Sequence, residues 1–120
     1  MILLDTDICL AMLKGNRKLV EGYANTSEAV CVSSITAQEL FYAANTSSSP
    51  VSNRILVEKF LLSVQIIHPD LEVLKFAAET QTKIIKRAGR VSYPDILLYS
   101  ISKVHNATLI TAEAARYCFT

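Results

Sequence analysis

Four acidic residues fall at points of the sequence where a folded chain brings strand ends together. They are Asp5, Glu39, Asp95 and Glu113. Asp5 and Glu113 follow short apolar segments, while Glu39 and Asp95 lie in the first turns of expected helices. The carboxyl ends of parallel strands share one edge of a sheet, and carboxylates that converge there normally hold a hard cation. Oxygen ligands suit Mg²⁺ or Mn²⁺, whose usual substrates are phosphates.

The same four acids also suit a purely structural role at helix ends. Residues 36–39 read Thr-Ala-Gln-Glu, a capping box in which Glu39 reaches back to the Thr36 amide. Ser92 and Asp95 have similar spacing, Asp5 is a possible N-cap, and Glu113 a first-turn acid. Asp7, two residues beyond Asp5, can point toward the same site or away from it. Metal binding and helix capping therefore both remain open.

The strands that position these acids are expected from four short apolar runs. They cover residues 1–4, 30–33, 64–67 and 108–111. The runs are continuous rather than alternating, which is typical of a parallel sheet covered by helices on both faces.

Helices are expected between these strands. They cover residues 8–14, 17–23, 36–44, a segment opened by Pro50, 70–88 and 95–105. In the helix over 70–88, Leu74, Ala77, Ala78 and Gln81 have the spacing of one helical face. The alternation predicts an α/β fold, a single three-layer α/β/α domain over residues 1–120 with a mostly parallel sheet of four to five strands.

Composition narrows the classes of protein. The chain has 120 residues, 51% of them hydrophobic, with only three glycines and three prolines, which excludes a disordered or collagen-like chain. No apolar run reaches membrane-spanning length, and no basic segment precedes residues 1–4 as in a signal peptide. Three widely spaced cysteines are typical of a reducing compartment. We expect a cytoplasmic globular domain.

Basic residues cluster more than the net charge of +1 indicates. Lys83, Lys86, Arg87 and Arg90 lie within eight residues, just before Asp95. They suit either contacts with a nucleic-acid backbone or a solvated helix end. The chain has no zinc-ligand spacing, no nucleophile elbow and no glycine-rich phosphate loop.

Four segments in order resemble a known family. They are residues 1–7 (MILLDTD), 35–40 (ITAQEL), 94–98 (PDILL) and 107–113 (ATLITAE). Their order and spacing resemble the PIN domain, and specifically the VapC-type toxins of bacterial type II toxin–antitoxin systems. The resemblance spans nearly the whole chain.

The resemblance implies an endoribonuclease that depends on Mg²⁺ or Mn²⁺, forms a homodimer and is inhibited by a cognate antitoxin protein. Asp5, Glu39, Asp95 and Glu113 match the acids of the family that are catalytic and bind the metal, and Thr6 and Thr111 match its supporting hydroxyls. Asp7 stands where Asn is commoner, and residues 112–117 are a weak version of the family's last motif. RNA is the implied substrate, with Lys83, Lys86, Arg87 and Arg90 as candidates for its backbone.

Two other functions fit parts of the pattern. Asp5 and Asp7 after a strand also resemble the first motif of haloacid-dehalogenase-like phosphatases, although the later lysine and acidic pair of that family are missing. A non-catalytic binding module, in which the acids only cap helices, is the third possibility.

Overall fold

A parallel sheet forms the centre of the computed structural model, which describes residues 1–85, 92–113 and 117. Within these residues the sheet has four strands: β1 (Ile2–Leu4), β2 (Val30–Ser33), β3 (Gln65–Ile67) and β4 (Thr108–Ile110). Their order is β3-β2-β1-β4, and every neighbouring pair is parallel. The four predicted strands are thereby confirmed, each to within one residue at either end.

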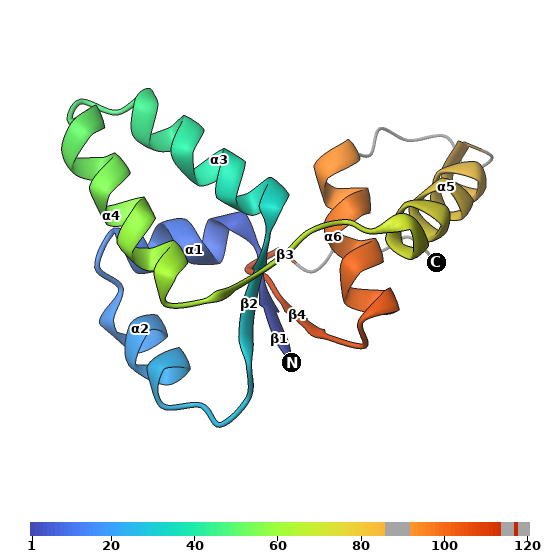
Figure 1. Cartoon of the computed structure of the whole chain (residues 1–120), viewed down its shortest axis with the longest axis horizontal. Helices are drawn as coiled ribbons and strands as arrows, with labels where there is room; N and C mark the ends of the chain where they lie inside the picture. The colour runs from blue at the N-terminus through green and yellow to red at the C-terminus, as the bar shows by residue number, and fades with distance from the viewer. Residues whose placement is uncertain (86–91, 114–116, 118–120) are drawn as a thin grey trace.

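Among the described residues, six helices cover the two faces of this sheet (Figure 1). On one face lie α1 (Thr6–Leu13), α2 (Arg17–Ala24), α3 (Ser34–Asn45) and α4 (Pro50–Leu62), and on the other α5 (Leu71–Ile85) and α6 (Tyr93–Val104). The α/β/α prediction is confirmed. The predicted continuation of α5 to residue 88 lies outside the described residues.

Alternate residues of the strands feed two cores on opposite sides of the sheet. Ile2, Leu4 and Val32 pack with α1, α3 and α4. Leu3 and Cys31 pack on the other side with Val73, Leu98 and Ile101 of α5 and α6. Because both faces bury apolar side chains, the central strands show no polar alternation.

Strand β3, at one edge of the sheet, and helix α5 differ from the sequence-based expectation. In β3, Gln65 and Ile66 are exposed and only Ile67 is buried, because this strand has a single neighbour. The buried side of α5 carries Val73, Ala77 and Thr80, while Leu74 is 43% exposed. The predicted face is therefore confirmed at Ala77 and wrong at Leu74 and Ala78, which are exposed. No helix among the described residues is long and apolar enough to cross a membrane.

The helices that follow β1 and β2 begin immediately at the strand ends. Asp5 caps α1, and its carboxylate accepts the backbone N–H of Ile8. Ser33, the last residue of β2, caps α3 and accepts the backbone N–H of Thr36. The predicted capping box at residues 36–39 is wrong, because α3 begins two residues earlier than expected. These direct strand-to-helix junctions bring both helix N-termini to one edge of the sheet.

Candidate active site at the carboxyl edge of the sheet

A small cavity of about 70 Å³ lies at this edge. Its polar lining comes from two strand–helix junctions and from α6: Thr6, Asp7, Ser33, Thr36, Glu39 and Asp95. Its apolar lining is Ile35, Pro94, Leu98 and Tyr117. The cavity thus gathers carboxylates from α1, α3 and α6, segments that lie far apart in the sequence.

Asp5 does not belong to the cavity lining; it is buried between β1 and the lining residue Thr6, with only 1% of the residue exposed. Its Oδ1 accepts the Ile8 backbone N–H at 2.9 Å, which confirms its predicted capping role. Its other oxygen, Oδ2, is also buried but has no hydrogen-bond partner among the described residues. A buried carboxylate oxygen without a partner is costly. Capping of α1 therefore explains the position of Oδ1 but not the burial of Oδ2.

Glu39 projects from the second turn of α3 and lines the cavity. The Thr6 hydroxyl donates to its Oε1 at 2.8 Å. The Thr36 backbone N–H, which a capping box would direct to Glu39, bonds to Ser33 instead. Glu39 therefore takes no part in capping α3, and its carboxylate is held at the cavity by a residue of α1.

Asp95 lies in the first turn of α6 and is half-buried at the cavity. Its backbone N–H donates to the hydroxyl of Ser92, the N-cap, at 3.3 Å, as the spacing predicted. The positive end of a helix dipole favours an anion at this position. The carboxylate of Asp95 thereby faces the same cavity as Glu39.

Glu113 and Thr111 lie beyond β4, apart from the residues that line the cavity. The Glu113 backbone N–H donates to the Thr111 hydroxyl at 3.0 Å, and Glu113 is exposed. β4 pairs with β1 in parallel, and the Asp5 backbone N–H donates to the Ile110 carbonyl. Both residues therefore follow the strand beside Asp5 without reaching the cavity itself.

Asp7, Ser33 and Thr36 also belong to the cavity, although sequence reasoning did not select them as site residues. The side of α1 on which Asp7 lies was open from the sequence, and the structure places it on the cavity lining. Ser33 and Thr36 have the spacing of an N-cap and its third residue, a signal that pointed to the true start of α3.

The donor chemistry of the site fits a hard cation such as Mg²⁺ or Mn²⁺. No three carboxylate, histidine or cysteine side chains within residues 1–85, 92–113 and 117 are grouped closely enough to form a complete protein cage. Mg²⁺ seldom needs such a cage, because it keeps several water ligands and binds through one or two carboxylates and the substrate phosphate. Asp5, which precedes the lining residue Thr6, adds a buried oxygen, Oδ2, that has no hydrogen-bond partner among the described residues.

Cys9 lies one turn beyond Asp5 and is fully buried. Burial, and then the nearby Asp5 charge, raise the pKa of the Cys9 thiol to about 12. Cys31, on the other face of the sheet, also has its pKa raised, chiefly by burial. Both residues are thus protonated, apolar parts of the core rather than nucleophiles or metal ligands.

The basic cluster is described only in part. Lys83 is exposed on α5 and does not line the cavity. Lys86, Arg87 and Arg90 lie outside the described residues. The structure therefore describes only Lys83 of the four residues in this cluster.

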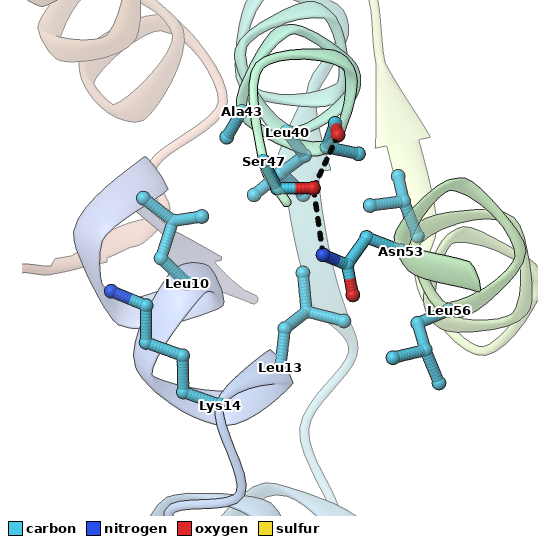
Figure 2. A pocket seen from close by; sticks show the side chains of 10 residues that line it. Leu10, Leu13, Lys14, Leu40, Ala43, Ser47, Asn53 and Leu56 are labelled. Carbon is cyan, nitrogen blue, oxygen red and sulfur yellow. Dashed lines mark hydrogen bonds between the residues drawn. The ribbon is translucent and has the colours of Figure 1, made fainter. Parts of the chain in front are cut away.

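A second hollow, of about 160 Å³, lies between α1, α3 and α4 (Figure 2). Leu10 and Leu13 face Leu40 and Leu56 across it, and Asn53 donates to the Ser47 hydroxyl at 2.8 Å. Its lining includes one cation, Lys14, and no carboxylate. It lacks the groups for the chemistry of the first cavity.

Comparison with known proteins identifies the family to which the chain belongs. The PIN domain family matches residues 2–115. The chain is 33% identical to "Ribonuclease VapC2" of Haemophilus influenzae over 110 residues, which cover 91% of this chain and 83% of the relative. It is 23% identical to "tRNA(fMet)-specific endonuclease VapC" of Shigella flexneri over 116 residues, 96% of this chain and 88% of that protein.

Among solved structures, the fold is similar to VapBC2 from Rickettsia felis bound to a promoter DNA fragment. The TM-score is 0.88 at 25% identity, with 99% of this chain and 95% of that chain covered. VapBC from Salmonella typhimurium gives a TM-score of 0.85 at 23% identity, with 98% and 91% covered. The gathered carboxylates, the family match and the similarity to a ribonuclease together show that the chain belongs to the PIN domain family, among its VapC ribonucleases.

Proposed function

We propose that this chain is the endoribonuclease toxin of a type II toxin–antitoxin pair, and that it cleaves RNA with the help of Mg²⁺ or Mn²⁺ at the carboxylate cavity. The observation that carries the proposal is the cavity lined by Glu39 and Asp95, directly preceded in the chain by Asp5, whose buried Oδ2 has no partner among the described residues. The similarity to VapC ribonucleases supports RNA as the substrate.

In this proposal Asp5, Glu39 and Asp95 hold the cation, and Glu113 reaches it through water. The chemistry that a bound cation supplies is neutralisation of charge on the scissile phosphate and a lower pKa for a water molecule. The residues of the protein position the groups of the site. Thr6 holds Glu39, the first turn of α6 carries Asp95 to the cavity, and Leu98 and Tyr117 line the same cavity. Thr111 supports the segment that carries Glu113.

RNA contact outside the cavity is assigned to the basic cluster. Lys83 is the member on the described part of α5, and Lys86, Arg87 and Arg90 follow it in sequence. Contacts of lysine and arginine with phosphates position a nucleic acid without reading its sequence. They therefore contribute affinity, while the shape of the target RNA supplies specificity.

The partner in this proposal is a cognate antitoxin protein, and the toxin forms a homodimer in the cytoplasm. The Rickettsia felis and Salmonella typhimurium structures of similar fold are VapBC complexes, which supports a protein partner. The family membership removes the phosphatase alternative.

The proposal is tested by cleavage of end-labelled total tRNA and of a structured mRNA, with Mg²⁺ or with EDTA. An identically purified Asp95→Asn variant serves as the control for contaminating nucleases. We expect discrete cuts that require the cation and vanish in the variant. Cuts that persist in both EDTA and Asp95→Asn contradict the proposal, and metal binding without cleavage of any RNA favours a non-catalytic binding module.

A further inference from the structure

A continuous series of hydrogen bonds leads from the protein interior to the Glu39 carboxylate. The Thr36 backbone N–H lies 3.0 Å from Ser33 Oγ, and Ser33 Oγ lies 3.3 Å from Thr36 Oγ1. Thr36 Oγ1 lies 3.2 Å from Thr6 Oγ1, which lies 2.8 Å from Glu39 Oε1. The series therefore joins the end of β2, the first turn of α3 and the first turn of α1.

The hydrogens in this series can be ordered by counting, because each hydroxyl has only one. An ionised carboxylate only accepts, so the Thr6 hydrogen is committed to Glu39. The contact between Thr6 and Thr36 then requires the hydrogen of Thr36, and the contact between Thr36 and Ser33 requires that of Ser33. Ser33 in turn accepts from the Thr36 amide. Every donor points toward Glu39.

The inner members of the series are removed from water. Ser33 is 0% exposed and Thr36 is 1% exposed. With so little exposed surface, aligned hydrogen bonds polarise one another. The buried hydroxyls of Ser33 and Thr36 therefore connect to the exposed Glu39 carboxylate only through Thr6.

We propose that Thr36, backed by Ser33, is a positioning residue of the cation site, which acts by orienting the Thr6 hydroxyl and through it the Glu39 carboxylate. The inference rests on the proposed function, because it requires Glu39 to bind a cation. Thr6 occupies Oε1, and no hydrogen bond to Oε2 is found among the described residues. The series thus holds one oxygen and leaves the other for the cation.

A simple packing role for Thr36 makes the opposite prediction. Thr36→Val keeps the shape and removes the hydroxyl, while Thr36→Ser keeps the hydroxyl and removes the methyl group. If Thr36 only fills space, Thr36→Ser is the damaging change and Thr36→Val is tolerated. If it positions Glu39, Thr36→Val is damaging at the site and Thr36→Ser is tolerated.

The test is the affinity of the whole chain for Mn²⁺, measured by isothermal titration calorimetry without RNA. Loss of a residue that orients a metal ligand typically weakens affinity by about 10- to 100-fold, and we expect about tenfold for Thr36→Val. Thr36→Ser should bind within about twofold of the unaltered chain. Equal affinity of Thr36→Val and the unaltered chain, or a larger loss in Thr36→Ser, overturns the proposal.

A double-mutant cycle with Glu39→Ala shows whether the effect passes through Glu39. Thr36→Val should cause no further loss of Mn²⁺ affinity once Glu39 is absent, whereas an independent structural effect adds to that of Glu39→Ala. If Thr36→Val fails to fold, Thr36→Ser and Thr36→Ala replace it as a pair that differs only in the hydroxyl. If the unaltered chain binds no Mn²⁺, the proposed function fails with the inference. Binding that ignores Thr36 overturns the inference alone.

Discussion

Asp5→Asn separates the two roles of the most deeply buried acid in the site. In the native chain, Oδ1 caps α1 at 2.9 Å from the Ile8 nitrogen, while Oδ2 is buried and has no partner in the part of the chain that the structure describes. Asparagine keeps the accepting oxygen and replaces the second oxygen by a neutral NH₂ group. The helix cap is retained, because Asn and Asp are similarly effective N-caps. The buried charge is removed.

The size of the effect follows from these two contributions. The N-cap is worth about 1 kcal/mol and does not change. A buried polar group without a partner costs about 1–3 kcal/mol, and a charged group costs more than a neutral amide. We therefore expect Asp5→Asn to raise the free energy of unfolding by about 1–2 kcal/mol in EDTA, since part of the cost remains with the amide. For a chain of this length 1 kcal/mol corresponds to about 4 °C in Tm.

A divalent cation should make the native chain more stable than Asp5→Asn, the reverse of the order expected in EDTA. A ligand at 100 times its Kd stabilises the folded state by about 2.7 kcal/mol, and Mn²⁺ should give this gain to the native chain alone. Thermal unfolding in EDTA and in Mn²⁺ measures both effects. Asp70→Asn is the matched control, because Asp70 also accepts a backbone N–H, that of Val73 at 3.0 Å, but is exposed. It should change stability by less than about 0.5 kcal/mol under either condition.

Two results would refute this reasoning. A loss of stability in Asp5→Asn of about 1 kcal/mol or more in EDTA would mean that the native carboxylate is well satisfied without a cation. An equal gain from Mn²⁺ in the native chain and in Asp5→Asn would remove Asp5 from the cation site.

Two further predictions concern the basic cluster and the buried thiol. Lys83→Gln should reduce the slope of log affinity for RNA against log salt concentration by about one. The control is Lys75→Gln on the same helix, which should change the slope less, because Lys75 pairs with Glu72 at 3.4 Å. Equal slopes for the two variants would remove Lys83 from the RNA interface. The raised pKa of Cys9 favours the protonated thiol in the folded state, so its contribution to stability is complete below pH 9.0 and is lost as pH rises toward about 12. In denaturant melts, Cys9→Ala should lose less stability than the native chain over that pH range, and an equal loss would contradict the raised pKa of Cys9. Peptide mapping at pH 8 should show Cys9 unlabelled by iodoacetamide until the chain unfolds.

The strands and most helices could be predicted because their signals are local. Four continuous apolar runs, each followed or separated by helical segments, leave little choice except a parallel sheet with helices on both faces. The approach of Glu39 and Asp95 to one cavity could be expected from the same topology, because strand ends share an edge, whereas Asp5 at the end of β1 does not belong to the lining. Glu113 also follows a strand, but it lies beyond the cavity lining.

The predictions that were wrong, for the N-cap of α3 and the buried face of α5, required a choice between neighbouring residues of similar type. Ser33 and Thr36 both offer an N-cap for α3, and only the exact strand end shows that Ser33 is used. In α5, Val73 and Leu74 are adjacent apolar residues, and packing against α6 decides which is buried. The bond between Thr6 and Glu39 joins residues 33 positions apart, so no local pattern encodes it.

In the proposed reaction, a water molecule activated at the carboxylate cavity attacks the RNA phosphate. The most direct measurement is the chemistry of the fragment ends, read by ligation and phosphatase treatment of RNA cut in Mg²⁺. Attack by water should leave a 5′-phosphate and a 3′-hydroxyl, and Asp95→Asn should yield neither. A 2′,3′-cyclic phosphate with a 5′-hydroxyl would show attack by the ribose instead, and it would contradict the mechanism proposed for this site.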